Sequence, residues 1–164
     1  MANMQPDQAV PLTVALYQPD IPQNTGTILR MCACLGLAAV IIEPAGFPAS
    51  DRHFRRAGMD YLAHVEIARH PHWADFDVWR RANGRRLILL STKASLPYTD
   101  FLYRPGDILL AGRESAGVPA NIHEAADARL VIPLREPMRS LNVAVAVAMV
   151  AGEAIRQMRL GTMS

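Results

Sequence analysis

The sequence has no apolar stretch long enough to cross a membrane. Its longest candidate, Val143–Ala151, falls far short of the roughly 20 residues that a membrane-spanning helix needs. The N-terminal residues 1–11 contain no positively charged segment followed by an apolar one, so no secretory signal is expected. These two absences predict a cytoplasmic protein with no membrane partner.

Cysteine is scarce as well, because Cys32 and Cys34 are the only two in the chain. Two residues apart on a predicted helix, their side chains would point about 200° away from each other. That geometry argues against a disulfide between them. We therefore expect both cysteines to be small, reduced core residues, as is usual for a protein of a reducing compartment.

The motifs of several large enzyme classes are missing. No Gly-x-Gly-x-x-Gly follows the first apolar run, so a Rossmann dinucleotide site is not supported. Neither a P-loop nor the elbow of a nucleophilic serine is present. The five histidines show no ligand spacing beyond the triplet at 70–72, which is more typical of a loop than of a metal centre. We expect no metal cofactor.

Lysine is nearly absent, since Lys93 stands against 16 arginines, yet the net charge is only +2. The arginines gather at residues 52–56 and 80–86. A GC-rich genome or a solvated charged face would explain such clusters. Arginine is also the residue that grips phosphate with a planar fork of donors. Composition alone leaves both interpretations open.

Segments typical of strands and of helices alternate along the chain, without repeats or a linker. Apolar runs rich in Val, Ile and Leu predict strands at 13–18, 38–44, 64–69, 86–92, 107–112 and 128–134. Helices are expected at 24–35, 50–62, 73–83, 121–126 and 140–160. The pattern predicts an α/β protein with a mostly parallel sheet and helices on both faces. At this length we expect a single domain over 1–164, with residues 1–11 flexible.

The last predicted helix is unusually apolar at its start. From Leu141 to Val150 only Asn142 is polar. A helix that is apolar all round must be buried on every side. In a chain of this size, full burial is reached most easily if a second subunit covers one face, so we expect a homodimer that uses this helix.

Three loops that follow apolar runs carry the candidate chemistry: 20–30, 109–119 and 131–146. Open α/β sheets bind their ligands at the carboxyl ends of the strands, which is where these loops begin. In the first loop, Pro22 and Gly26 are expected to shape a tight turn.

Each loop also contains polar residues for which plain turn chemistry is the alternative explanation. Asn24 is expected to cap the first helix. Gly112 and Gly117 flank a charged pair, and glycines after a strand let a ligand approach the backbone. Ser140 and Asn142 enter an apolar helix, where polar groups are costly unless they are used.

Taken together, the segments "NTGTILR", "LLAGRESAGVP" and "IPLREPMRSLNVAVAVA" resemble the three motifs of the SPOUT superfamily of RNA methyltransferases, in its SpoU branch. Within that branch the chain is similar to the single-domain enzymes that methylate the ribose of the wobble nucleotide, C34 or U34, of tRNA. This likeness lies in "LYQPDIPQNTGTILRMCACLG", "IIEPAGFPASDRHFRRAGMDY" and "RLILLSTK". It covers nearly the whole chain, from Val14 to Met158.

The resemblance implies a fold with a C-terminal trefoil knot (the SPOUT or α/β-knot fold), which the sequence pattern itself does not indicate. It implies S-adenosylmethionine as methyl donor, S-adenosylhomocysteine as product, and an obligate homodimer. The substrate implied is the anticodon stem-loop of leucine tRNAs. Because the chain lacks the added RNA-binding domain of larger relatives, it must grip tRNA with its own surface and that of its partner.

The resemblance also implies roles for individual residues. The donor site falls on Leu90, Gly112, Ile132, Ser140 and Leu141, and the catalytic candidates are Arg30, Glu114, Ser140 and Asn142. A 2′-hydroxyl is a weak nucleophile, so it must be aligned with the methyl group and must lose a proton. The family's proposed base is the arginine that matches Arg30. Because a guanidinium pKa lies above about 12, we expect Arg30 at least to hold the neighbouring phosphate.

Contacts to tRNA are expected from Arg30, Arg52, Arg55, Arg56 and Arg139, since phosphate binding dominates affinity for nucleic acid. Arg113 departs from the asparagine or proline that relatives usually carry before the glutamate. Three alternatives are methylation of another tRNA or an rRNA site, an RNA-binding module without activity, and a nucleotide-binding enzyme that does not act on RNA. The last leaves the arginine clusters unexplained.

Overall fold

The computed structural model describes residues 11–161, so residues 1–10 of the N-terminal segment expected to be flexible lie outside the described residues. Within this range, seven parallel strands form one sheet in the order β3-β2-β1-β6-β4-β7-β5. The strands are β1 (Thr13–Tyr17), β2 (Ala38–Ile42), β3 (Ile67–His70), β4 (Leu87–Leu90), β5 (Leu96–Pro97), β6 (Ile108–Ala111) and β7 (Ala128–Val131). All six expected strands are confirmed, with shifted ends, whereas the two-residue β5 was not predicted.

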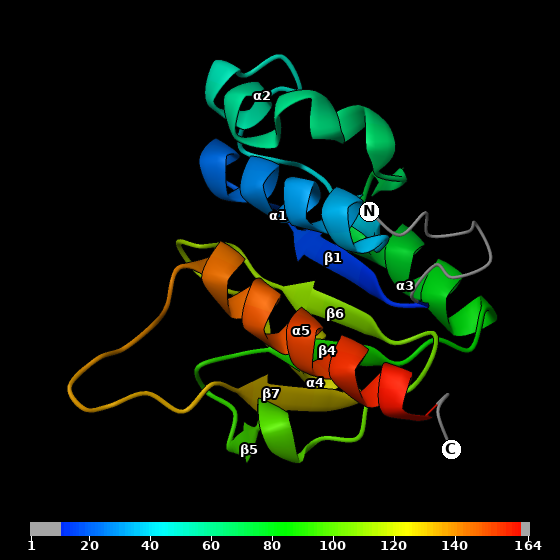
Figure 1. The fold of residues 1–164 in the computed structure, drawn as a ribbon, viewed down its shortest axis with the longest axis vertical. Coiled ribbons are helices and arrows are strands. Elements are labelled where there is room, and N and C mark those ends of the chain that lie inside the picture. Colours follow the sequence, from blue (N-terminus) through cyan, green and yellow to red (C-terminus); the bar gives the residue numbers. More distant parts are fainter. Residues whose placement is uncertain (1–10, 162–164) are drawn as a thin grey trace.

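Helices cover both faces of the sheet, as the sequence predicts (Figure 1). On one face lie α1 (Pro22–Leu35) and α5 (Val143–Gly161), with α2 (Arg52–Gly58) packed outside α1, and on the other lie α3 (Trp73–Ala82) and α4 (Ala120–Ala125). Short 3-10 helices follow α2 at Met59–His64 and precede β6 at Tyr98–Asp100. None of the helices in residues 11–161 combines the length and apolar composition that a membrane crossing needs.

Each central strand contributes to two cores, because its side chains alternate between the faces of the sheet. Leu109 of β6 joins the core under α1 and α5, whereas Leu110 joins the core under α3 and α4. Cys32 of α1 belongs to the first core, and burial raises the pKa of its thiol to about 12. Cys34 is exposed, so the expectation that both cysteines are core residues is wrong for Cys34.

Gly26 lies inside α1 rather than in a turn, so the predicted turn at Pro22 and Gly26 is wrong. Pro22 is the first residue of the helix, where its fixed φ and missing N–H are tolerated. A Cβ at Gly26 would stand 2.5 Å from the carbonyl oxygen of Phe54 and 2.7 Å from Cβ of Ala57, both on α2. Glycine is therefore what permits α1 and α2 to pack this closely.

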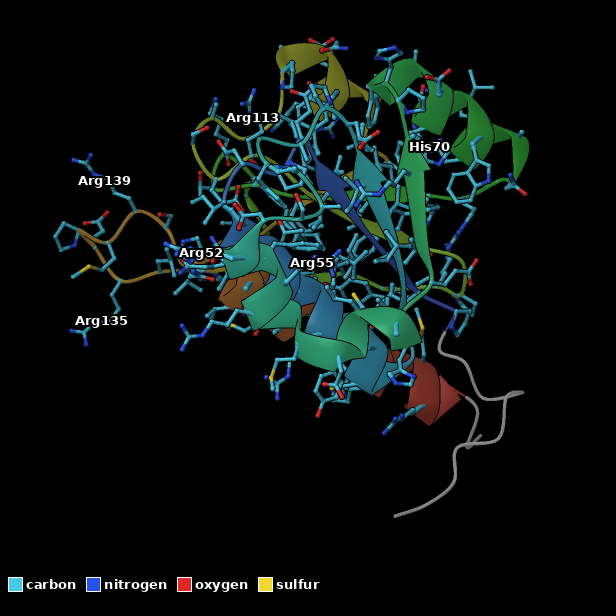
Figure 2. All side chains as sticks on the ribbon, turned by 90° about the horizontal axis from the view of Figure 1, so that it is seen from above. Arg52, Arg55, His70, Arg113, Arg135 and Arg139 are labelled. Atoms are coloured by element: carbon cyan, nitrogen blue, oxygen red, sulfur yellow. The ribbon has the colours of Figure 1, made fainter. Side chains whose placement is uncertain are left out.

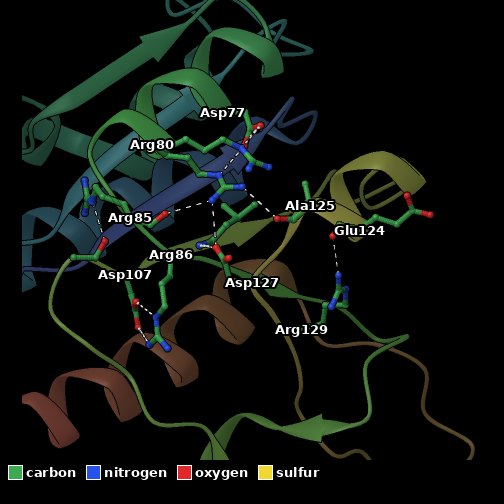
Figure 3. Close-up of polar contacts among 12 residues, drawn as sticks. Asp77, Arg80, Arg85, Arg86, Asp107, Glu124, Ala125, Asp127 and Arg129 are labelled. Atoms are coloured by element: carbon green, nitrogen blue, oxygen red, sulfur yellow. Dashed lines mark hydrogen bonds and ion pairs between the residues drawn. The ribbon is translucent and has the colours of Figure 1, made fainter.

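The second arginine cluster, residues 80–86, lies at the amino ends of the strands (Figure 3). The side chain of Arg80 is 4% exposed. Its Nε donates to Asp77 (2.7 Å) and its Nη1 donates to Asp127 (3.2 Å). Its Nη2 donates to the carbonyl of Ala125 (3.2 Å). Arg80 is thus a buried structural residue, so the predictions of a solvated charged face and of a phosphate-binding group are wrong for it.

Arg85 and Arg86 extend this network to two more strands. Arg85 donates to the carbonyl of Gly106 (2.8 Å) and to the hydroxyl of Thr13 at the start of β1 (2.8 Å). Arg86 donates through Nε and Nη2 to both oxygens of the buried Asp107, at 2.8 and 2.7 Å. The network therefore ties the beginnings of β1, β4, β6 and β7 together.

We expect Gly26→Ala to lower the free energy of unfolding by about 1–2 kcal/mol, measured by urea denaturation. The added methyl group meets backbone on α2, and overpacking of this kind typically costs about 1–3 kcal/mol. That cost exceeds the gain of about 1 kcal/mol that alanine usually brings to a helix. Thr27→Ala, at the exposed next position of α1, is the control and should change stability by less than about 0.5 kcal/mol. A Gly26→Ala variant as stable as the wild type would contradict the packing argument.

Candidate active site

A cavity of about 550 Å³ opens at the carboxyl ends of the central strands. Its wall is built by the segments that follow β4, β6 and β7, together with the beginnings of α1 and α5. Open α/β sheets bind their ligands at this edge. The cavity is thus the candidate active site.

The cavity brings together residues that are far apart in the sequence. Its wall contains every residue predicted to bind the donor and three of the four predicted catalytic residues: Leu90, Gly112, Glu114, Ile132, Ser140, Leu141 and Asn142. Their roles stay predictions, although their common location agrees with the pattern of the three loops. Ser140 and Asn142 are exposed in the single chain, so the cost of burying a polar group does not account for them.

The loop after β6 closes on itself as a tight hairpin. Arg113 and Gly117 exchange two backbone hydrogen bonds, of 3.0 and 2.7 Å. Gly117 has a φ of +66°, and a Cβ at Gly112 would stand 2.6 Å from the carbonyl carbon of Gly117. The two glycines are therefore required by the hairpin itself, which holds Glu114 on the cavity wall.

Glu114 is bonded to the loop that follows β1. The N–H of Asp20 donates to Oε2 of Glu114, and the N–H of Glu114 donates to Oδ1 of Asp20, each at 3.2 Å. Burial, followed by the contact with the Asp20 carboxyl, raises the pKa of Glu114. The pKa of Asp20 is lowered, first by its contact with Glu114 and also by the hydroxyl of Ser115 and the charge of Arg113.

Asn142 caps α5, which gives this polar residue a structural use. Its Oδ1 accepts hydrogen bonds from the N–H groups of Ala144 (2.8 Å) and Val145 (3.3 Å). Its Nδ2 donates to Oδ1 of Asn24 on α1 (2.9 Å). Asn24 does not cap α1 as predicted, because the residue at the cap position is Ile21. The Asn24–Asn142 bond instead joins the first and third loops.

Arg30 does not line the cavity of its own chain. Its Nη1 donates to the sulfur of Met59 (3.3 Å), and its guanidinium lies 4.7 Å from the ring centre of Tyr61. These contacts hold Arg30 against the 3-10 helix that follows α2. Its catalytic role stays a prediction.

The remaining predicted tRNA contacts lie on the surface of the protein and do not line the cavity. Arg52, Arg55 and Arg56 are exposed on α2, and Arg139 is exposed on the loop that joins β7 to α5. Figure 2 shows Arg139 on this loop where it projects from the body of the protein, and Arg52 on the same side of the molecule. Phosphate groups can reach guanidinium groups at such positions without displacing core contacts.

Comparison with known protein families identifies the chain. Residues 11–152 match the model of the SpoU rRNA Methylase family, which is most of the sequence. The chain belongs to the SpoU rRNA Methylase family. The α/β fold with its parallel sheet agrees with solved SpoU structures.

Relatives within the SpoU family include a protein of Beijerinckia indica named tRNA (cytidine(34)-2′-O)-methyltransferase. It is 72% identical over 144 residues, which are 88% of this chain and 90% of the relative. A solved structure described as "Structural insights into the 2-OH methylation of C/U34 on tRNA" is 40% identical, with a TM-score of 0.86, and the match covers 90% of this chain and 96% of the other. An AdoMet-bound rRNA methyltransferase from Sinorhizobium meliloti is 31% identical, with a TM-score of 0.82, over 88% of this chain and 56% of the other.

Sequence reasoning missed several residues of this SpoU cavity. Asn24 lines the wall and Asp20 bonds the lining residue Glu114, but nothing in a single sequence indicates these long-range bonds. Lys93 lines the cavity, and its one signal was that it is the only lysine. His123 of α4 also lines it, and its Nε2 is buried without a hydrogen-bond partner among the described residues.

We expect Asn142→Ala to lower the free energy of unfolding by about 1 kcal/mol, because α5 loses its N-terminal cap. Asn142→Asp keeps the capping oxygen but loses the amide that donates to Asn24. It should therefore unfold at nearly the wild-type urea concentration. Equal destabilisation by both substitutions would mean that the bond to Asn24, and not the cap, stabilises the start of α5.

Proposed function

We propose that this chain is an S-adenosylmethionine-dependent tRNA 2′-O-methyltransferase that acts on the ribose of nucleotide 34, C34 or U34, of leucine tRNAs. One observation carries the proposal. In a SpoU family member that is 72% identical to a protein named for this reaction, Glu114, Ser140 and Asn142 line one cavity at the carboxyl ends of the strands. The proposed product is S-adenosylhomocysteine.

The cavity fits a donor of this kind. Its volume of about 550 Å³ lies in the range of about 300–1,000 Å³ that is typical of small-molecule sites. Arg113 Nε and His123 Nε2 are buried without hydrogen-bond partners among the described residues, and both residues line the wall. The adenosine and methionine parts of the donor carry acceptors for such groups. Leu90, Ile132 and Leu141 add apolar surface for the adenine.

Bound S-adenosylmethionine supplies an electrophilic methyl group to this site. In the balanced reaction the ribose 2′-oxygen would take the methyl group, S-adenosylhomocysteine would leave, and the 2′ proton would pass to solvent. Ser140 supplies a hydroxyl that can hydrogen-bond to the donor or to the 2′-hydroxyl. Asn142, fixed by its bond to Asn24, holds the start of α5 against the site. Alignment of the reacting atoms by such contacts is a large part of catalysis.

Arg30 has a separate part in the proposal. Its guanidinium would hold the phosphate next to the target ribose, and its positive charge would favour loss of the 2′ proton. Arg30 does not line the cavity of its own chain. In the proposed dimer, each cavity would therefore receive Arg30 from the other subunit. Glu114 would orient that cation.

A homodimer through α5 is therefore included in the proposal. The support is an apolar surface on this helix that the single chain leaves uncovered. Val145 is 48% exposed and Met149 is 38% exposed, although both belong to the most apolar part of the sequence. Burial of such a surface is what drives the association of subunits.

Three further features belong to the proposal: one domain over residues 1–164, a cytoplasmic location and a C-terminal trefoil knot. The knot is supported by the likeness to the solved 2′-O-methylation structure, with its TM-score of 0.86. The loop before β6 also contacts α5. Gln157 donates to the carbonyl of Phe101 and accepts from the N–H of Tyr103, each at 3.0 Å.

The anticodon stem-loop would lie across the exposed arginines. Arg52, Arg55, Arg56 and Arg139 would contact its phosphates, because all four are exposed. Figure 2 shows Arg52 on the side of the molecule from which the loop with Arg139 projects. Each phosphate contact makes binding more sensitive to salt.

We expect Arg30→Ala to reduce methyl transfer to leucine tRNA transcripts by about a hundredfold or more, since loss of one group that stabilises charge in the transition state typically costs about 10²–10³. Label from methyl-labelled S-adenosylmethionine would be counted and the modified nucleotide mapped. Arg81→Ala, which removes an exposed arginine of α3, should leave the rate within about twofold.

A transcript with a 2′-deoxynucleotide at position 34 is the matched substrate control and should accept no label. Label at another tRNA position, or in rRNA alone, would contradict the assigned substrate. Binding of tRNA without turnover under all conditions would instead indicate an RNA-binding module.

The double substitution Val145→Asp with Met149→Asp should convert the proposed dimer into monomers, because two charges would have to be buried without partners. Sedimentation velocity measures the change directly. Val78→Asp introduces a charge at a residue of α3 that is 70% exposed, and it should leave the subunit number unchanged. A wild-type protein that sediments as a monomer would contradict the dimer.

A further inference from the structure

Two carboxylic acids meet at the rim of the cavity, on loops that are 94 residues apart in the sequence. The backbone N–H of each residue donates to the carboxylate of the other, so Asp20 and Glu114 form a closed pair of hydrogen bonds. With only one of these two hydrogen bonds, the side chain of either residue could still rotate. The reciprocal pair fixes both carboxyl groups and the two loops at once.

Further contacts hold Asp20 in place. The hydroxyl of Ser115 donates to its Oδ2. Nε of Arg113 stands 3.9 Å from the same oxygen, and Nη1 of Arg113 donates to Gln18 at 3.4 Å. Gln18 has a φ of +42°, which is uncommon for a residue other than glycine and is found where surrounding contacts hold the backbone. Asp20 is thus the best-supported polar residue of the first loop.

We propose that Asp20 is a positioning residue for Glu114 and holds its carboxylate on the cavity wall through the reciprocal pair of hydrogen bonds. This inference rests on the proposed function, in which ionised Glu114 orients the cation that holds the RNA phosphate. Asp20 itself touches neither substrate nor donor in this scheme.

The charges around the pair support this assignment. Burial and the Asp20 carboxyl raise the pKa of Glu114, while the pKa of Asp20 is lowered. The first proton taken up by the pair therefore goes to Glu114. The other charged or titratable groups on the cavity wall are Arg113 of the same hairpin, Lys93 after β4 and His123 of α4. Ionised Glu114 is lost as the pH falls through its raised pKa.

Two substitutions separate the charge of Asp20 from its contacts. Asp20→Asn keeps an oxygen to accept from the N–H of Glu114 but removes the negative charge. We expect the acidic limb of the kcat profile to move about one unit to lower pH, since a neighbouring like charge typically shifts a pKa by about 1 unit or more. Asp20→Ala removes the contacts, and kcat should fall about tenfold at every pH while KM for tRNA stays within about twofold. Asp75→Asn, an exposed residue of α3, is the control and should change neither quantity.

A second measurement needs neither tRNA nor donor. The Glu114 carboxyl carbon is followed by NMR in protein labelled with carbon-13 at its glutamate side chains, and Glu114→Gln identifies the signal. Its midpoint should lie above the usual glutamate range in the wild type and fall in Asp20→Asn. Thermal unfolding checks that each variant is folded.

The outcomes are distinct. An unchanged Glu114 midpoint in Asp20→Asn, or an unchanged pH profile, would overturn the positioning role. A fall in activity of Asp20→Ala that appears only as a higher KM for tRNA would also overturn it, because Asp20 would then contribute to RNA binding. A wild-type protein that methylates no tRNA would contradict the proposed function. The NMR titration would still decide whether Asp20 affects the titration of the Glu114 carboxyl.

Discussion

The arginine–aspartate network at the amino ends of the strands, which contains the buried Arg80 and Asp107, is the interaction on which the rest of the structure depends. Arg80 and Arg86 bond Asp127 and Asp107, residues that immediately precede β7 and β6. A charge in such a place is tolerated only when it is fully paired, so this end of the sheet has one arrangement. The register of β4, β6 and β7 is fixed there by hydrogen bonds and ion pairs as well as by apolar packing.

The polar side chains at the two ends of the sheet consequently have different roles. At the amino ends the polar side chains bond one another. At the carboxyl ends the same strands lead into loops whose polar groups line a cavity. Arg113 and His123 there have nitrogen atoms without hydrogen-bond partners among the described residues. Stability and ligand binding are thus separated along the strand direction, as is usual for α/β folds. The proposed positioning of Glu114 by Asp20 depends on this separation, because the strands that carry both loops are anchored elsewhere.

Hydrophobic patterning was enough to predict the five α-helices in residues 11–161 and every strand there except the two-residue β5, because the other strands are rich in Val, Ile, Leu and Ala. The three motifs also located most of the cavity wall. What the sequence could not reveal is pairing over distance. Nothing beside Arg80 indicates that its partner is Asp127, so a buried ion pair looked like a charged surface. Gly26 looked like a turn residue because the local sequence does not reveal the helix that Gly26 contacts. The contact of Arg30 with Met59 could not be predicted for the same reason.

The bond between Asn24 and Asn142 has a consequence for the order in which the molecule is made. It joins α1, which leaves the ribosome early, to the start of α5, which is synthesised more than a hundred residues later. The contacts that complete the cavity are of this long-range kind, and contacts between distant residues are slow to form. A nascent chain that ends before α5 contains all seven strand segments that the structure describes but lacks one wall of the cavity. The site is therefore finished last, and a growing chain presents no complete site to the RNA that surrounds it on the ribosome.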